Sequence, residues 1–280
     1  MSGRDSKATI DAFGEQWTRF TENEGYYASP EILRDITGPL LPANAFAGAR
    51  VADIGSGTGR FANILLDEGA AEVIAIEPSA GFQTLQRNLA HRGDRVRLLN
   101  VRGDQIPADV RDLDWVISIG VLHHIPEPEP VVRAAYGALK PGGRILVWLY
   151  GREGNFAYLV WAEPLRRITT ALPPILLRGL SWALTPLLSF YAAICRRAPF
   201  LPLASYMADT IARVDWPARM LIIYDQLAPE CARYYRRDEA RTLVADAGFT
   251  DVTLYHRKGY SWTVLATKPL ILISPTQPAA

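Results

Sequence analysis

A glycine-rich turn between two apolar runs could hold a nucleoside-containing cofactor. Residues 51–54 have the composition of a buried strand, and Gly55, Gly57 and Gly59 follow it at alternate positions. Glycine adopts the backbone angles needed where a strand turns sharply into a helix, and its missing side chain lets a ligand lie close. Glu77 follows the next apolar run, at the spacing where an acid can accept hydrogen bonds from both hydroxyls of a ribose.

Two registers of this turn predict two different cofactors. The dinucleotide pattern G-x-G-x-x-G/A fits residues 57–62, but it leaves Gly55 and Ser56 without a purpose. The pattern D-x-G-x-G-x-G fits residues 53–59 without a shift. The first register indicates a nicotinamide-dependent reductase, which tight NADH binding would establish.

Three later motifs extend the second register. They are Asn-Val-Arg-Gly-Asp at 100–104, Gly-Val-Leu-His-His at 120–124, and Lys-Pro-Gly-Gly at 140–143 before another apolar run. Together with residues 53–59, these motifs resemble those of class I S-adenosylmethionine (SAM)-dependent methyltransferases. The resemblance is to the type 11 subgroup, which includes quinone methyltransferases. It covers about residues 50–150, resumes near 247–252, and is specific for the cofactor rather than for the methyl acceptor.

The resemblance implies a set of cofactor-binding residues. Asp53 would lie near the amino group of SAM, the turn would pack against the amino-acid part and the sugar, and Asp104 would lie near the adenine. Trp17 belongs to a segment similar to the N-terminal cover of such enzymes, or else to an apolar stripe with Phe13 and Phe20. The residues expected to bind SAM, and its product S-adenosylhomocysteine, are Asp53, Gly55, Ser56, Gly57, Gly59, Glu77, Pro78, Asp104, Gln105, Gly120 and Trp17.

His123 and His124 are the candidate catalytic residues. A methyl group on a sulfonium sulfur is already activated, so the protein mainly has to align the nucleophile and exclude water. A hydroxyl or ring-carbon nucleophile must also lose a proton, and a neutral histidine can accept it near pH 7. Adjacent side chains often point in opposite directions, so at least one of the two is expected to line the pocket.

Four tyrosines are candidate substrate-binding residues. Tyr26 and Tyr27 precede the core in the N-terminal cover, and Tyr150 ends the fifth expected strand. Tyr224 lies in Tyr224-Asp225-Gln226, where the chain returns from a long insertion and either contacts the substrate or forms a hinge. No metal ligands are expected.

Strands and helices alternate from residue 50 to residue 150, which predicts a Rossmann-like, mostly parallel sheet. Two further strands at 251–256 and 260–267 would add an antiparallel hairpin and make seven strands. The expected division is an N-terminal helical cover (1–45), a SAM-binding core (46–150), an apolar helical lid (151–229) and the rest of the core (230–280). Helices are expected in the lid near 156–171, 175–194 and 204–227.

The lid is apolar and basic. Residues 164–208 contain five arginines and no acid, and residues 179–195 are an uncharged run that is slightly short for a membrane span and contains Pro186. This composition predicts a lid packed on the core, with membrane contact or a homodimer interface as the alternatives. An apolar lid also suits an apolar or amphipathic acceptor.

The overall composition narrows the partners. The 280 residues carry 30 Lys and Arg against 29 Asp and Glu, so no nucleic-acid partner is expected. Two cysteines without a CxxC pair make a disulfide framework or zinc site unexpected. The N-terminus lacks an apolar signal core, which favours a cytoplasmic location. The expected activity is O- or C-methylation of a small molecule, with a non-catalytic SAM-binding protein as a further alternative.

Overall fold

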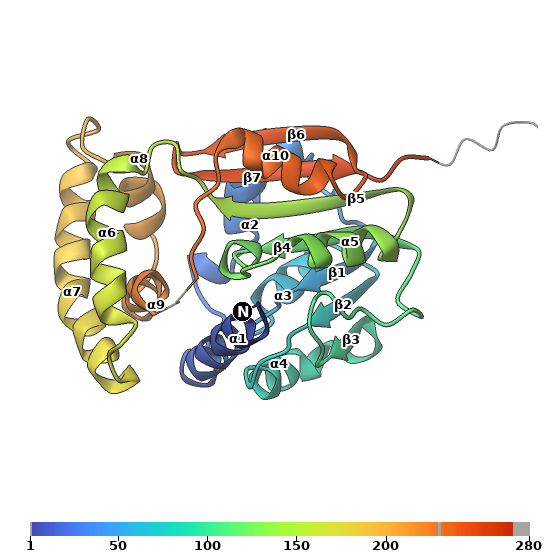
Figure 1. Ribbon diagram of the computed structural model, residues 1–280, viewed down its shortest axis with the longest axis horizontal. Coiled ribbons are helices and arrows are strands. Elements are labelled where there is room, and N and C mark those ends of the chain that lie inside the picture. The colour runs from blue at the N-terminus through green and yellow to red at the C-terminus, as the bar shows by residue number, and fades with distance from the viewer. Residues whose placement is uncertain (1, 229–230, 271–280) are drawn as a thin grey trace, which may run out of the picture.

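The computed structural model describes residues 2–228 and 231–270. Its centre is a seven-stranded sheet in the order β3-β2-β1-β4-β5-β7-β6 (Figure 1). β1 to β5 are parallel, while β7 runs antiparallel to β5 and β6 runs antiparallel to β7. The predicted Rossmann-like fold class is confirmed. The strands are β1 Arg50–Ile54, β2 Glu72–Ile76, β3 Val96–Leu99, β4 Leu113–Ile119, β5 Leu139–Tyr150, β6 Thr250–Arg257 and β7 Ser261–Thr267.

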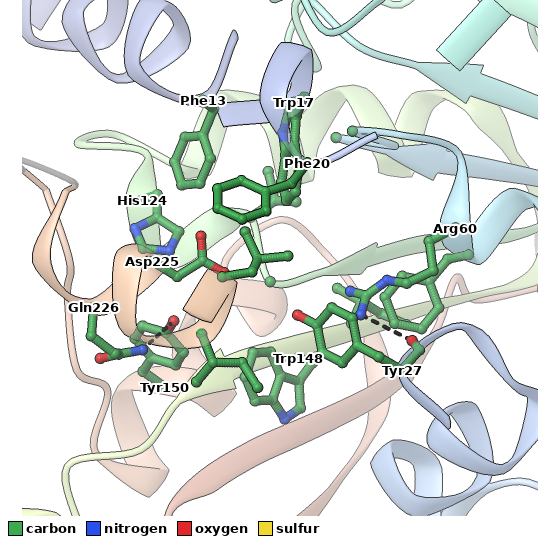
Figure 2. Close-up of a pocket in the computed structure, with 18 of the residues that line it drawn as sticks. Phe13, Trp17, Phe20, Tyr27, Arg60, His124, Trp148, Tyr150, Asp225 and Gln226 are labelled. Atoms are coloured by element: carbon green, nitrogen blue, oxygen red, sulfur yellow. Dashed lines mark hydrogen bonds between the residues drawn. The ribbon is translucent and has the colours of Figure 1, made fainter. Parts of the chain in front are cut away.

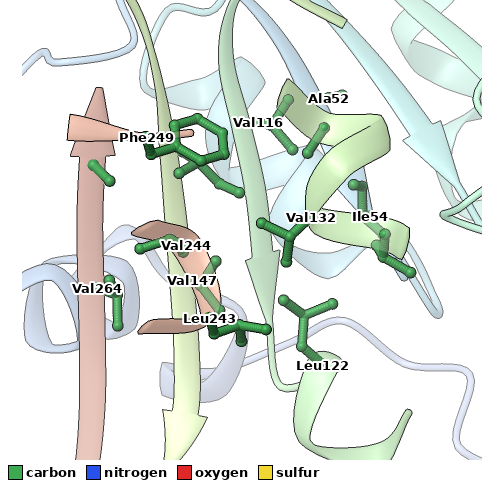
Figure 3. Close-up of a cluster of buried hydrophobic side chains, with 14 of the residues drawn as sticks. Ala52, Ile54, Val116, Leu122, Val132, Val147, Leu243, Val244, Phe249 and Val264 are labelled. Atoms are coloured by element: carbon green, nitrogen blue, oxygen red, sulfur yellow. The ribbon is translucent and has the colours of Figure 1, made fainter. Parts of the chain in front are cut away.

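Helices cover both faces of the sheet. α5 and α10 pack on one face, where residues such as Val132 and Val244 form a continuous core with Val116 and Val147 (Figure 3). α2, α3 and α4 cover the other face through a second core. This double cover explains why the central strands are continuous apolar runs rather than alternating ones. The bounds are α1 Ser2–Arg19, α2 Pro30–Thr37, α3 Arg60–Asp67, α4 Phe82–Leu89, α5 Glu129–Ala138 and α10 Arg237–Ala245, with 3₁₀ turns η1 Tyr26–Ala28, η2 Gly38–Leu40, η3 Ala90–Arg95 and η4 Leu122–His124.

The segment after β5 forms a separate group of helices beside the sheet (Figure 1). These are α6 Phe156–Thr169, α7 Pro174–Cys195, α8 Ala204–Tyr206, a π-helical turn η5 Met207–Ile211, and α9 Trp216–Leu227. We call residues 151–228 the insertion. The lid boundary expected at Pro229 lies outside the described residues.

The single helix expected at 204–227 is in fact broken. The Asp215 side chain accepts a hydrogen bond from the backbone N–H of Ala218 at 2.9 Å, so it caps the start of α9. Pro217 occupies the first turn of α9, where the missing N–H of proline has no cost. The Asp-x-Pro sequence therefore starts a new helix. As a result α9 is separate from the preceding turn, and its residues line one side of the cavity.

The insertion exposes many large apolar side chains, including Phe156, Ile175, Trp182 and Phe190. Within the described residues, α7 is long and apolar enough to cross a membrane by length and composition, and 22% of its most apolar window is buried. One such helix is weak evidence for a membrane location, because the core helices of other proteins pass the same test.

A buried ion pair joins α2 to the C-terminal hairpin. The Arg257 guanidinium is almost fully buried and pairs with Asp35 of α2, which Lys258 also contacts at 3.2 Å. Arg257 lines the same cavity as the glycine turn. Because its charge is already compensated by Asp35, Arg257 serves to fix this wall rather than to bind an anion.

Candidate active site

A cavity of about 580 Å³ lies at the carboxyl ends of the parallel strands. Its size is in the range of small-molecule sites. The glycine turn, Glu77 and Gly120 line one half, which we call the cofactor half. Aromatic side chains from α1 and β5, together with His124 and α9, line the other half, which we call the acceptor half (Figure 2). The sheet, α1 and the insertion therefore contribute to one continuous space.

The glycine turn has the register that begins at Asp53. Gly55 has φ +77°, and a Cβ atom there would lie 2.5 Å from the Val121 side chain. No other residue fits this position, so the first glycine is required by the turn itself. The nicotinamide register does not explain a glycine at position 55, whereas the positive φ and the close approach of Val121 do. Gly57 has φ +56°, and a Cβ atom there would lie 3.1 Å from the Trp17 ring.

Glu77 is tied to the turn by two backbone hydrogen bonds. Its Oε2 accepts from the N–H of Gly57 at 2.8 Å, and its Oε1 accepts from the N–H of Ser79 at 3.0 Å. Each carboxylate oxygen keeps a further lone pair, so Glu77 can also accept from a ribose diol. Asp104 also lines the cavity, and both of its carboxylate oxygens accept from Arg102 at 2.9 Å.

Asp53 is buried behind the turn and lacks a complete set of partners. Its side chain is 2% exposed and does not line the cavity, and its Oδ2 has no hydrogen-bond donor among the described residues. Burial raises the pKa of Asp53 to about 7; the Ser56 side chain lowers this pKa and the nearby Glu77 raises it. A buried acceptor without a donor fits a ligand amino group, which Asp53 would reach through a water molecule because its side chain does not line the cavity. The residues present therefore fit SAM.

The raised pKa of Asp53 predicts a pH-dependent stability. The folded protein holds this proton more tightly than the unfolded chain, so the stabilisation is complete below about pH 4 and is lost as pH rises to about 7. Asp53→Asn should remove this loss, which is at most a few kcal/mol because one unit of pKa corresponds to about 1.4 kcal/mol. Urea unfolding at pH 5 and pH 8 measures it. If the free energy of unfolding fell equally in the variant and the parent between pH 5 and pH 8, Asp53 would not be the source of the pH dependence.

Trp17 of α1 lies on the cofactor half of the cavity. Its ring approaches Gly57, and its Cβ would lie 2.7 Å from a Cβ at Gly81. Asn23, a few residues later, donates to the carbonyl of Thr58 at 2.8 Å. These contacts place the N-terminal segment directly over the glycine turn.

The two histidines occupy different environments. His124 lines the cavity, and its Nδ1 lies 2.8 Å from the carbonyl oxygen of Cys231. A carbonyl only accepts, so Nδ1 carries the proton and Nε2 keeps its lone pair. Burial lowers the pKa of His124 to about 4, so the ring is neutral at pH 7. His123 does not line the cavity; it is fully buried, its ring stacks on Tyr150 at 3.8 Å, and neither nitrogen has a partner among the described residues.

The insertion presents Asp225 and Gln226 to the cavity, whereas Tyr224 points into the helical core beside Phe20. Gln226 donates from Nε2 to the Tyr150 hydroxyl at 2.8 Å, and its Oε1 accepts from Tyr158 at 2.7 Å. Asp225 is therefore a site residue that sequence reasoning did not single out. The sequence marked the segment Tyr224-Asp225-Gln226 as a possible substrate contact. It did not indicate which of the three side chains faces the cavity.

Of the other residues expected in the site, some line the cavity and others lie outside it. Tyr27 lines the cavity, where its ring lies 3.7 Å from the Arg60 guanidinium, while Tyr26 lies outside it beneath Arg213. Gln105 is exposed, and Gly59 begins α3 without lining the space. No group of three or more metal-ligating side chains occurs within residues 2–228 and 231–270. The expected residues that line the cavity are Trp17, Tyr27, Gly55, Ser56, Gly57, Glu77, Pro78, Asp104, Gly120, His124 and Tyr150.

Comparison with known proteins agrees with this geometry. Residues 52–147 match the family model described as "Methyltransferase domain". A tRNA U34 carboxymethyltransferase of Methylococcus capsulatus is 36% identical over 126 residues, which are 44% of this chain and 37% of that protein. Phosphoethanolamine N-methyltransferase 2 of Caenorhabditis elegans is 31% identical over 148 residues, which are 51% of this chain and 32% of that protein. The chain thus matches about a third of the length of these curated relatives.

Solved structures agree on the fold. Human N-acetylserotonin methyltransferase in complex with SAM superposes with a TM-score of 0.53 at 15% identity, over 92% of this chain and 56% of that one. The pyocyanin biosynthetic protein PhzM gives 0.52 at 14% identity, over 85% and 55%. Residues 52–147 therefore form a methyltransferase domain, and the chain as a whole has the fold of these solved methyltransferases.

One prediction from the composition is wrong. Balanced charge was expected to exclude a nucleic-acid partner, but several relatives over this domain are named for a tRNA acceptor. Net charge averages over the whole surface, so it cannot exclude a local contact with RNA.

Proposed function

We propose that the protein transfers a methyl group from SAM to a small, largely apolar acceptor in the acceptor half of the cavity. The continuity of the two halves carries this proposal, because one space connects the glycine turn to His124 and Tyr150. SAM supplies a methyl group on a positively charged sulfur. The chain holds the cofactor through Glu77 and the turn, and it excludes water with α1 and the insertion.

The proposal is tested by binding and by turnover. Calorimetry should show SAM binding, and S-adenosylhomocysteine should form only when an acceptor from a panel of apolar small molecules is present. NADH should not bind. SAM binding without product on any panel would favour a non-catalytic SAM-binding protein, and an absence of SAM binding would refute the proposal.

Transfer to RNA is the second candidate function. The names of the tRNA U34 carboxymethyltransferase relatives favour it, and a single flipped base could stack on the aromatic walls of the acceptor half. Such relatives also suit a cytoplasmic location, which we propose for this protein. Assays with bulk tRNA and with the small-molecule panel, run in parallel, separate the two acceptors.

His124, rather than His123, should support turnover. His124→Ala should lower kcat by about 100-fold or more, because general-base groups contribute about 10²–10⁴-fold. His123→Phe is the matched neighbour variant, and it should keep activity and stability because it replaces a buried ring whose nitrogens lack partners by an apolar one. The comparison uses S-adenosylhomocysteine formation and thermal unfolding. If His123→Phe lost more kcat than His124→Ala, His123 rather than His124 would be the histidine that supports turnover.

A further inference from the structure

The Asp225 carboxylate is an unpaired charge in the wall of the acceptor half. It lies in the last turn of α9, and Figure 2 shows it directed into the cavity on the same side as His124. Its Oδ1 accepts a hydrogen bond from the Gln16 amide of α1. Among the described residues no cation forms an ion pair with Asp225, and its Oδ2 has no hydrogen-bond donor. Burial raises the pKa of this carboxyl to about 7, and both Gln16 and the more distant Arg60 lower it.

A purely structural role does not explain a carboxylate here. The contact with Gln16 needs only one acceptor oxygen, which an amide or hydroxyl would supply without bringing a charge into an enclosed space. A half-buried carboxylate without a cation costs free energy, and that cost is offset when a ligand brings the opposite charge. The position therefore indicates a ligand rather than a packing requirement.

His124 provides a second acceptor at the same wall. Its Nδ1–H is used by the Cys231 carbonyl, so its Nε2 offers a lone pair. The cationic side chains that line the cavity are engaged elsewhere. Arg102 pairs with Asp104, Arg257 with Asp35, and Arg60 with the ring and carbonyl of Tyr27. Among the described residues that line the cavity, no arginine forms an ion pair with Asp225, so a positive charge for this carboxylate has to come from a ligand.

Aromatic rings complete this half of the cavity. They present apolar surface to the body of a ligand, and their faces attract a cation. The rings are those of Phe13, Phe20, Trp148 and Tyr150. A carboxylate, an imidazole lone pair and aromatic faces together match a group that carries several N–H donors and a positive charge.

We propose that Asp225 anchors an amine, so that the methyl acceptor is an amino group carried on an apolar or aromatic body. This inference rests on the proposed methyl transfer, and it replaces the expected oxygen or carbon acceptor by nitrogen. The ammonium pairs with Asp225 and donates to His124. Transfer of one proton from the ammonium to Nε2 of His124 frees the nitrogen lone pair, and Asp225 keeps its negative charge beside the amine. That pair forms the bond to the methyl carbon as the carbon–sulfur bond breaks, and the electron pair of the broken bond stays on sulfur.

Three probes of similar shape test the inference. 2-Phenylethylamine, 2-phenylethanol and 3-phenylpropanoate are titrated by calorimetry into protein saturated with S-adenosylhomocysteine. The amine should bind at least about tenfold more tightly than the alcohol, as a charge-assisted hydrogen bond predicts, and the carboxylate should bind most weakly. Asp225→Asn keeps the shape and the Gln16 contact, and it should remove the preference for the amine.

Asp215→Asn is the matched control in the same helix. Asparagine caps helices as well as aspartate does, so this variant should keep both α9 and the preference for the amine. Equal binding of amine and alcohol to the parent protein, or no binding of the amine, would overturn the inference even if Asp225→Asn failed to fold. The affinity for S-adenosylhomocysteine is measured first. Its absence would refute the proposed methyl transfer, whereas its presence without amine preference would refute only the amine site.

Discussion

Replacing Gly57 with arginine should abolish SAM binding. Gly57 has φ +56°, where side chains are strained, and a Cβ there already meets the Trp17 ring at 3.1 Å. An arginine side chain would therefore fill the space between the turn and α1, which is the space that the cofactor is proposed to occupy. Calorimetry with SAM measures the loss, and circular dichroism checks that the sheet is retained.

Gly137→Arg is the matched control for this variant. Gly137 lies in α5, and a Cβ there would have no neighbour within 4 Å. Arginine favours helices more than glycine does, so this control should keep the fold and full SAM affinity. SAM affinity that is unchanged in a folded Gly57→Arg protein would show that the cofactor binds elsewhere.

Removing the Glu77 carboxylate should weaken SAM binding by about 10- to 100-fold. A hydrogen bond to a charged group contributes about 1.5–3 kcal/mol, and each 1.4 kcal/mol is a factor of ten. Glu77→Ala loses the proposed contact with the ribose, and it also loses the acceptors that hold the Gly57 and Ser79 amides in place. The turn that faces the cofactor should loosen as a result.

Two further variants separate these effects. Glu77→Gln keeps one acceptor oxygen and should lie between the parent and the alanine variant. Glu72→Ala removes an acid at the start of β2, the strand that Glu77 follows. Glu72 pairs with Arg50 near the surface, so this variant should leave SAM affinity unchanged. Equal affinities in all four proteins would remove Glu77 from the cofactor site.

The parallel core could be predicted closely from the sequence. β1 and β2 coincide with their apolar runs to within one residue at the start, because strands covered on both faces are mostly apolar along their length. β5 is longer than its apolar run, since Leu139 already pairs with Leu113 before the irregular Pro141-Gly142-Gly143 segment. Glycine and proline suggest a turn there, and only the pairing partner shows that the strand continues.

The acceptor half could not be predicted in the same way. Gln16 and Asp225 are 209 residues apart, and no periodicity or spacing indicates that they touch. Tyr224 and Asp225 are neighbours on α9, so the orientation of that helix decides which of them faces the cavity. That orientation follows from the packing of α9 on α6 and α7, which depends on many contacts of one apolar surface with another rather than on a motif.

The division of the cavity into two halves has a consequence for protein engineering. The cofactor half comes mainly from residues 52–147, whereas much of the acceptor half comes from α1 and the insertion, on either side of that stretch in the chain. A chimera that exchanges these two flanking segments with those of a solved methyltransferase of the same fold would change the acceptor wall and leave the glycine turn in place. The two segments should be exchanged together, because Gln16 and Asp225 must match each other for the new wall to form.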